Sequence, residues 1–391
     1  MALTIQKQPG TYVAARNHVA WLIDVDPNWK TYVDYYVEMT IEAERDYGTG
    51  VYFELTKLRE YPGDGNQVTF NIRDRIKAIV SHDIPVVDQV NVIKLQETVR
   101  RFKVTIIEWK QAVGAPAPSP YSPFIVQDPR YVYNAGFSEY VGQKMTDWVG
   151  DGKFLTNMPR SLAITDVQPW WLDFVAPADE TYTAKVKIYY ENGTDTVKSL
   201  SSIAADEGDV LRWPAGWKQA KMHIESQRVL KYEFYVEDSS SIVSERITFI
   251  DSCDGSALLR YYLFLNSLGG YDTLCARGKL TSGEQVDSVS VRRQKGPFEA
   301  AEVAESFEVN TQHRETCEQY TGFLNRAQAL WLRDMRRTED AYRIGDRYPN
   351  WKGTGSLVPI RIERRSGPTH EDEALPEYTF TYEEAITHFG I

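Results

Sequence analysis

The amino-acid sequence predicts a mainly β protein built from tandem β-sandwich domains of immunoglobulin or fibronectin type, with a few short helices. Short runs of alternating apolar and polar residues recur along the chain, and turn residues separate them. Aromatic residues make up 13% of the 391 residues, and tyrosine and tryptophan are both favoured in strands. The length suits two to four domains.

Residues 1–112 are predicted to form the first β-sandwich. Its strands alternate apolar and polar side chains, which is typical of strands with one buried face. They are expected at residues 35–44, 51–58, 67–72 and 102–109. Ile72, Ile76 and Ile79 follow a helical period instead, and predict a short amphipathic helix.

A proline-rich segment follows this domain. Four prolines lie between Pro116 and Pro123. Because proline removes a ladder hydrogen bond and stiffens an extended chain, residues 113–130 are predicted to be a linker outside any sheet. A proline-rich ligand for the groove of a partner protein is the alternative.

Residues 131–250 are predicted to form a second β-sandwich. Residues 182–190 alternate between apolar and polar side chains, and Asn192-Gly193 follows them. Asn-Gly between alternating runs is a strong hairpin signal. Further strands are expected at residues 210–213, 229–236 and 242–250.

Residues 251–391 are predicted to form a C-terminal β-rich domain with one helix, placed at about residues 320–337. An apolar strand over residues 259–265 ends at a pair of glycines. Paired glycines supply backbone angles that other residues resist, so the chain is expected to reverse or to be closely approached there. We predict a structural turn formed by Asn266, Gly269, Gly270, Tyr271 and Asp272. Later strands are expected at residues 286–292, 306–310, 357–363 and 377–383.

Charge is unevenly distributed along the chain. The net charge of −11 disfavours nucleic-acid binding through phosphate neutralisation. Residues 326–365 contain ten Lys and Arg and five Asp and Glu, which gives this segment a net charge of +5. This region is either a solvated surface or a basic subunit interface that docks on an acidic neighbour. The predicted interface residues are Arg333, Arg336, Arg337, Arg364 and Arg365.

The three cysteines, Cys253, Cys275 and Cys317, are too few and too scattered for a disulfide framework. Synthesis in a reducing cytoplasm is therefore expected. The N-terminal residues lack a basic region followed by an apolar core, and no apolar run is long enough to span a membrane. We expect neither a signal peptide nor membrane insertion.

No catalytic residue, metal site or cofactor is predicted. His313 and Cys317 are four residues apart, but two ligands without a second pair do not make a zinc site. Asp251 and Asp254 lack the acidic pattern of a calcium loop. The acidic residues 371–373 could serve a glycosidase only if a second carboxylate met them in space. A solvated loop explains them more simply.

Tryptophans are the best binding candidates in the sequence. They could stack on sugar rings or anchor a partner protein. The alternative is that they pack in the cores at the edges of sheets. The residues concerned are Trp170, Trp171, Trp213 and Trp217.

Several segments together resemble tail and baseplate structural proteins of tailed bacteriophages, especially those of Bacteroidota hosts. The most specific is Leu265-Asn-Ser-Leu-Gly-Gly-Tyr-Asp272, which matches a Leu-Asn-x-Leu-Gly-Gly-Tyr-Asp motif. The others are residues 70–76, 154–159, 168–172 and 320–327. The resemblance covers most of the chain.

The resemblance implies a non-enzymatic virion protein, made in the host cytoplasm and located in the tail. We expect a homo-oligomeric ring or adaptor at the baseplate or tail tip, which joins the tube, the hub and the receptor-binding parts. Rigid tandem β-domains suit such rings, because each presents edges and loops to its neighbours. The alternatives are a carbohydrate- or receptor-binding module that contacts a host surface glycan, and a neck or connector component.

Overall fold

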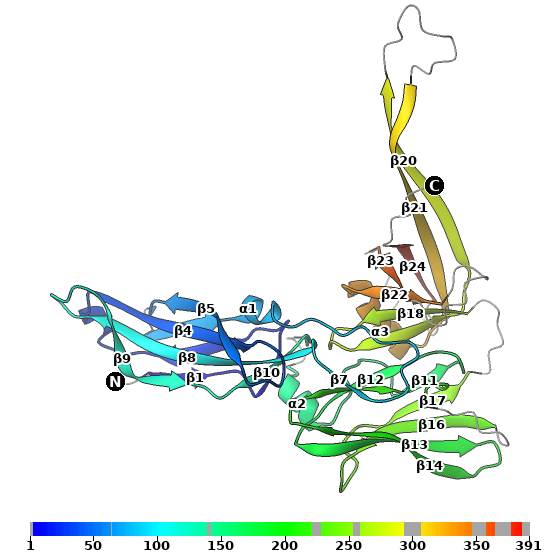
Figure 1. The fold of residues 1–391 in the computed structure, drawn as a ribbon, viewed down its shortest axis with the longest axis horizontal. Coiled ribbons are helices and arrows are strands. Elements are labelled where there is room, and N and C mark those ends of the chain that lie inside the picture. The colour runs from blue at the N-terminus through cyan, green and yellow to red at the C-terminus, as the bar shows by residue number, and fades with distance from the viewer. Residues whose placement is uncertain are drawn as a thin grey trace, which may run out of the picture.

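The computed structural model describes residues 3–63, 65–138, 142–220, 228–252, 259–292, 306–345, 357–363 and 377–384. Within these ranges the chain forms twenty-four strands and three α-helices, and the strands make five sheets. The predicted mainly β class with a few short helices is therefore confirmed. Figure 1 shows a first unit on the left, a second at the lower right, and a third above it that carries a long projection.

The first unit contains two sheets that share one core. The smaller sheet consists of β1 (Thr4–Lys7), β3 (Ala20–Asp24) and β6 (Gln67–Asn71). The larger has the order β2 (Tyr12–Ala14), β10 (Arg130–Tyr133), β8 (Val99–Gln111), β4 (Asp34–Glu44) and β5 (Tyr52–Glu60). Alternation along β4 and β8 places Met39 and Ile106 in a core with Trp21 and Phe70 of the smaller sheet. A 3-10 helix, η1 (Trp29–Thr31), and α1 (Arg73–Lys77) complete the unit, and α1 confirms the predicted short helix.

The prediction that residues 113–130 are a linker outside any sheet is wrong. Residues Ser119–Val126 form β9, which pairs with β8, and Pro120 lies opposite Trp109. Strand β9 occupies an edge of the larger sheet, where a missing N–H group need not break the ladder. After β9 the chain pairs again with β8 through β10, so the first unit continues to Tyr133.

The second unit contains a five-stranded and a three-stranded sheet. The first has the order β11 (Ser161–Ile164), β17 (Ile247–Asp251), β16 (Val229–Glu237), β13 (Glu180–Tyr190) and β14 (Asp195–Ala205). Strands β13 and β14 form the predicted hairpin, and Gly193 in its turn has φ of +83°. Helix α2 (Met145–Gly150) lies on the side of the first unit and contacts β2.

One strand of the second unit comes from the predicted first domain. The three-stranded sheet has the order β12 (Trp171–Val175), β15 (Val210–Pro214) and β7 (Ile93–Leu95). Strand β7 pairs with β15 although more than a hundred residues separate them in the sequence. The first two units are thus interlocked by their chain path. A three-residue strand leaves no periodicity in the sequence from which it could be predicted.

The third unit is built on one seven-stranded sheet. Its order is β19 (Tyr271–Ala276), β18 (Arg260–Leu265), β22 (Ala341–Ile344), β23 (Leu357–Ile362), β24 (Glu377–Glu384), β21 (Ser306–Phe323) and β20 (Leu280–Arg292). Helix α3 (Arg326–Arg337) contacts β18. The helix starts later than predicted, because residues up to Phe323 continue β21. A capping box between Asn325 and Gln328 sets its first turn.

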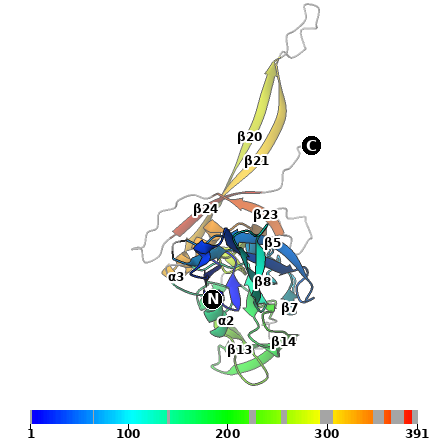
Figure 2. The same cartoon turned by 90° about the vertical axis from the view of Figure 1, so that its left-hand side faces the viewer.

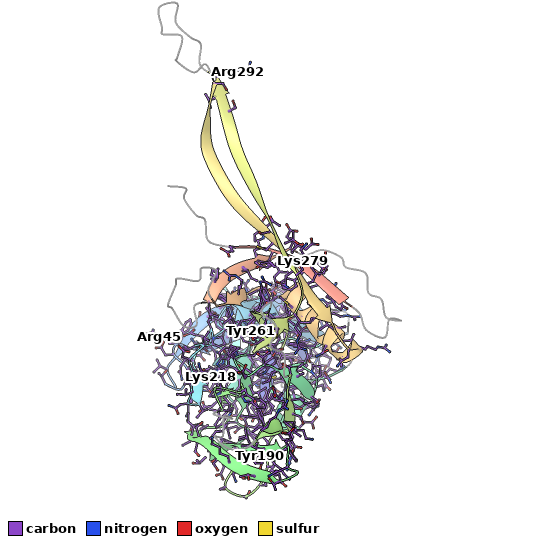
Figure 3. All side chains as sticks on the ribbon, turned by 90° about the vertical axis from the view of Figure 1, so that its right-hand side faces the viewer. Arg45, Tyr190, Lys218, Tyr261, Lys279 and Arg292 are labelled. Atoms are coloured by element: carbon purple, nitrogen blue, oxygen red, sulfur yellow. The ribbon has the colours of Figure 1, made fainter. Side chains whose placement is uncertain are left out.

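Strands β20 and β21 extend far beyond the rest of this sheet. They pair from Leu280 opposite Gln319 to Arg292 opposite Ser306. Strand β24 accompanies β21 only from Thr316 onward. Residues 284–292 and 306–315 therefore form a two-stranded ribbon, here called the arm. Figures 1 and 2 show it projecting from the body of the protein, and Figure 3 labels Lys279 near its base and Arg292 near its far end.

The second and third units share a hydrophobic core. One cluster contains Trp170 and Phe249 from the second unit together with Phe264 and Trp331 from the third. The ring centroids of Trp170 and Trp331 are 6.0 Å apart. The two units therefore pack as one body, although their sheets are separate.

Candidate functional site

The turn between β18 and β19 is organised by Asn266. Its side-chain Oδ1 accepts hydrogen bonds from the backbone N–H of Leu268 at 2.9 Å and of Gly270 at 3.2 Å. Its Nδ2 donates to the carbonyl oxygen of Leu155 at 2.9 Å. The chain reverses at the place that the sequence indicates. The buried Asn266 side chain holds the turn in its conformation and also ties it to the segment around Leu155.

Both glycines of this turn are closely approached by backbone from elsewhere in the chain. Gly269 has φ of +87°, and a Cβ atom there would lie 2.6 Å from the carbonyl oxygen of Asn134. A Cβ atom on Gly270 would lie 2.4 Å from the carbonyl oxygen of Leu155. A side chain at either position would require the backbone to move. Glycine is needed here for close contact as well as for conformation.

The turn joins all three units. Leu268 enters a cluster that contains Tyr133 of the first unit and Val175 of the second. The carbonyl of Ser267 accepts a hydrogen bond from the backbone N–H of Gly136 at 2.8 Å. Its hydroxyl donates to Asp334 of α3 at 2.9 Å. We call residues 266–272 and the groups that hold them the joint.

Asp272 lies at the buried end of the joint. Oδ2 of Asp272 accepts a hydrogen bond from the Trp331 indole Nε1 at 2.7 Å, and Asp272 as a whole is 1% exposed. Burial raises the pKa of Asp272 to about 7, although the hydrogen bond from Trp331 favours the ionised form. The carboxyl group thus titrates near neutral pH inside the packed core between the second and third units.

Tyr271 anchors the outer side of the joint through Asp340. The carboxylate of Asp340 accepts hydrogen bonds from the hydroxyls of Tyr271 and Tyr342, and His82 Nε2 lies 3.0 Å from its Oδ2. Burial opposes ionisation of Asp340, but the contacts with His82 and the two tyrosines outweigh it and hold its pKa below the usual range. Because His82 belongs to the first unit, this carboxylate ties the first unit to the third.

A buried ion pair supports the same region from the second unit. Arg212 and Asp173 form two hydrogen bonds, of 2.8 Å from Nε and 2.7 Å from Nη2, and the side chains are at most 1% exposed. The guanidinium carbon of Arg212 is 5.6 Å from the centre of the Tyr271 ring. Such a bidentate pair holds its two strands in register, because breaking it would leave a charge buried without a partner.

The four tryptophans predicted as contacts for a glycan or a partner lie in the cores. Trp170 and Trp213 are fully buried, and Trp171 and Trp217 are at most 5% exposed. Trp171 packs with Leu263 and Tyr271 at the contact between the second and third units. Core packing, the alternative that the sequence left open, describes these four residues, and none of their indole faces is open to a ligand.

Three of the five residues of the predicted basic interface lie on α3. On α3, Arg333 and Arg336 are half-buried, and the Arg336 guanidinium lies 4.9 Å from the centre of the Tyr378 ring. Arg337 is exposed at the end of the helix. Arg364 and Arg365 lie outside the described residues. The role of this region as a subunit interface stays a prediction.

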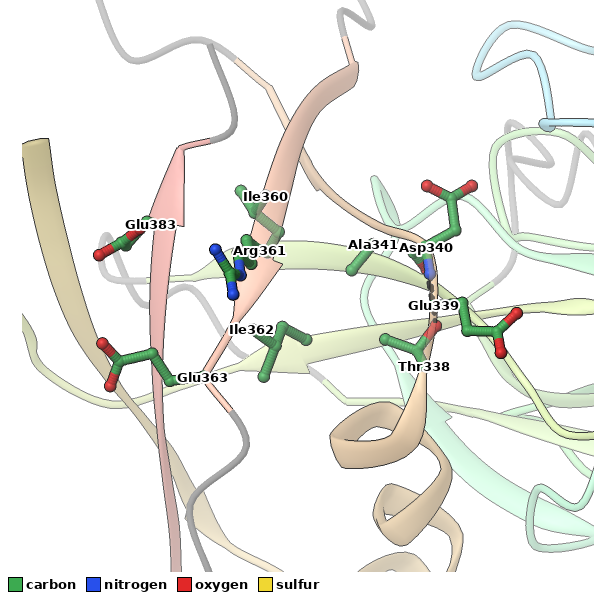
Figure 4. Close-up of a pocket in the computed structure, with 9 residues that line it drawn as sticks. All are labelled: Thr338, Glu339, Asp340, Ala341, Ile360, Arg361, Ile362, Glu363 and Glu383. Carbon is green, nitrogen blue, oxygen red and sulfur yellow. Dashed lines mark hydrogen bonds between the residues drawn. The ribbon is translucent and has the colours of Figure 1, made fainter. Parts of the chain in front are cut away.

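Two surface pockets flank the residues that follow α3. The first has a volume of about 700 Å³ and is lined by acidic side chains on both sides of Arg361, as Figure 4 shows. Its lining consists of Thr338, Glu339, Asp340, Ala341, Ile360, Arg361, Ile362, Glu363 and Glu383. The second, of about 630 Å³, lies over the joint between Arg16, Asn266, Ser267 and Arg337.

The described residues show neither a cluster of metal ligands nor a membrane-spanning helix. They contain no group of three or more His, Cys, Asp or Glu side chains placed to hold a metal ion. No helix in the described part of the chain is long and apolar enough to cross a membrane. His313 and Cys317, which do not make a zinc site by their spacing alone, lie on β21 rather than on a helix, and the side chain of His313 is outside the description.

The arm is the main structural feature that the sequence did not predict. Its strands were expected at residues 286–292 and 306–310, but neither their pairing nor their length was. Val289 is 57% exposed and Val291 is 39% exposed, on the same face of β20. In register they lie opposite Val309 and Phe307. The alternation of valine and serine in residues 288–291 was the available signal for a ribbon with one apolar face.

Comparisons with known proteins leave the family open. No protein-family model and no curated protein matches the chain. Among solved structures, trypsin-activated α2-macroglobulin from Escherichia coli is similar over 97% of this chain, with 8% identity and a TM-score of 0.20. The chain spans 23% of the length of that structure. A TM-score this low carries no argument about function.

Proposed function

We propose that this chain is a non-enzymatic structural subunit of the tail end of a tailed bacteriophage. It forms a homo-oligomeric ring or adaptor at the baseplate or tail tip, and joins the tube, the hub and the receptor-binding parts. It is made in the host cytoplasm and acts in the virion. The motif in residues 265–272 supports this proposal through its resemblance to tail proteins, and the arm supports it through its physical properties.

The arm is the single observation that carries the proposal. A two-stranded ribbon is at best marginally stable in water by itself. This ribbon extends past every other strand of its sheet and exposes Val289 and Val291. Such a surface gains stability when a neighbouring protein covers it. A protein that functions only when assembled has a use for such an arm, whereas an isolated binding module does not.

The rigid connection of the units also suits a part that transmits force. The joint fixes the first, second and third units through buried hydrogen bonds and glycine contacts rather than through a free linker. A ring subunit has to keep its faces in a constant geometry so that each copy meets the next in the same way. The glycan-binding alternative loses support, because its four tryptophans are buried.

Two measurements test the proposal. Light scattering on the purified chain, at low and at moderate salt, should give a trimer, hexamer or dodecamer, since a ring assembles from identical copies. Immunogold electron microscopy with an antibody to the chain should label one end of the tail of the virus particles that carry its gene. Labelling at the head–tail neck would assign the connector alternative. Particles without label would contradict a virion role.

A further inference from the structure

The arm has an open edge along β20. Among the strands that the structure describes, β20 is the last of the seven-stranded sheet and pairs only with β21. Its backbone N–H and C=O groups on the outer side therefore face away from the sheet. Natural proteins protect such edges with charges, proline or bulges. Residues 288–291, Ser-Val-Ser-Val, carry neither a charge nor a proline, although the register with β21 shifts between Asp287 and Val289.

Only one other long, exposed edge in the described sheets has an uncharged run without proline. Apart from β20, edge strands longer than five residues are β5, β9, β14 and β19. Strand β5 carries four charged residues, β9 contains Pro120 and Pro123, and β19 is almost entirely buried. Strand β14 has eleven residues, no proline, and an uncharged run from Ser199 to Ala205.

The arm and β14 cannot meet within one copy of the protein. Figures 1 and 2 place them at opposite ends of the molecule, with the arm above and the β13–β14 hairpin below. A contact between them therefore joins two copies through different surfaces. Such a head-to-tail contact closes into a ring when the rotation between copies permits it, and otherwise gives a filament.

Side chains on the two strands are also compatible. Val197 on β14 is 51% exposed, and the arm exposes Val289 and Val291. Paired strands lie about 4.8 Å apart, so side chains on the same face of the joined strands pack across the contact. The new ladder would satisfy the open backbone groups of both strands, and the valines would lose exposed apolar surface.

We infer that the open edge of β20 in the arm of one copy adds to the open edge of β14 in the next copy. This inference rests on the proposed ring assembly and names the surfaces that would hold it together. The five-stranded sheet of one copy thereby gains the arm of its neighbour as two further strands. The arm is then a connecting element between subunits rather than a free projection.

A photo-cross-linking experiment on the full chain tests this contact. The photoreactive residue p-benzoylphenylalanine replaces Ser290 in the arm, and isotopically light and heavy copies are mixed before irradiation. Mass spectrometry then identifies cross-linked peptides that contain one light and one heavy copy. We expect the partner peptide to cover residues 195–205. Cross-links to any other segment, or an absence of cross-links between copies, would overturn the inference.

A pair of charge variants gives an independent test. Val197→Lys combined with Ser199→Lys places two charges on the β14 edge, and should remove the assembled species seen by light scattering. Thr183→Lys, on the interior strand β13 and paired with both β14 and β16, adds charge to the same sheet and should leave assembly unchanged. Assembly that survives the β14 variant contradicts the inference. Immunogold labelling of tails is read separately, so the proposed function and this contact can fail independently.

Discussion

Asp272 lies in an environment that disfavours the ionised carboxylate. It is buried between the second and third units and receives the Trp331 indole N–H. A neutral carboxyl group fits this site better than a charged one, because burial removes the water that stabilises the charge. The sequence places Asp272 in the turn motif, but it holds no sign that Trp331, on a helix about sixty residues later, would cover it.

The pH dependence of stability follows from this burial. The pKa of Asp272 is about 7 in the folded protein and close to 3.8 when the chain unfolds. Between these values the folded state binds the proton and the unfolded state does not. The stability that this group contributes is therefore greatest below about pH 3.8, and it falls as the pH rises from there to about 7. From pH 5 to pH 8 the loss is about 3 kcal/mol.

Asp272→Asn provides the matched control for this effect. An amide oxygen can still accept the Trp331 hydrogen bond, but it has no proton to lose. Urea unfolding at pH 5 and pH 8 should show a smaller loss in the variant than in the wild type, by about 3 kcal/mol. Equal losses in the two proteins would mean that Asp272 is ionised in the folded state at both pH values.

Gly269 should not tolerate even one methyl group. Gly269→Ala combines a positive φ with a Cβ placed 2.6 Å from the Asn134 carbonyl oxygen. Gly48→Ala has a similar φ of +82° but nothing within 4 Å of its Cβ. We expect about 1 kcal/mol of destabilisation for Gly48→Ala from backbone strain alone. The loss for Gly269→Ala should exceed this by about 2 kcal/mol, because overpacking is added. Similar melting temperatures for both variants would contradict the close contact.

At the scale of elements, the features that local patterns determine were predicted correctly, whereas the pairing of distant segments was not. The β13–β14 hairpin and α1 follow from Asn192-Gly193 and from the spacing of Ile72 and Ile76, which act within a few residues. Strand β9 was missed because four prolines outweighed the pattern, although an edge position tolerates them. The arm was missed because the pairing of β20 with β21 spans a segment that sequence periodicity does not connect.

The apolar face of the arm should govern assembly. Val289→Glu combined with Val291→Glu places charges where the exposed valines lie, and should shift the protein toward lower mass in light scattering. Its melting temperature should change little, because exposed valines contribute little to the core. Ser290→Glu adds a charge to the opposite face of β20 as a control. If both variants lose assembly equally, charge alone rather than the valine face is responsible.

At the scale of the whole molecule, the three predicted domains are not independent. Strand β7 of the first 112 residues completes a sheet of the second unit, and the core of the second unit continues into the third. Domain boundaries drawn from composition cannot detect either feature, since both depend on contacts between distant segments. The joint is where these dependencies meet. The motif of the joint was visible in the sequence, but its contacts with the three units could not be predicted from it.

The shared core predicts how the molecule unfolds. Trp331→Ala removes a large side chain, 3% exposed, from the cluster common to the second and third units, and should cost about 3–5 kcal/mol. Hydrogen exchange measured by mass spectrometry should then speed up in β13 and β16 of the second unit as well as in β18. Strands β4 and β8 should keep their protection, because their core is separate. Trp21→Ala, in that separate core, should reverse the pattern. Loss of protection confined to the third unit in the Trp331 variant would show that the two units unfold independently despite their common core.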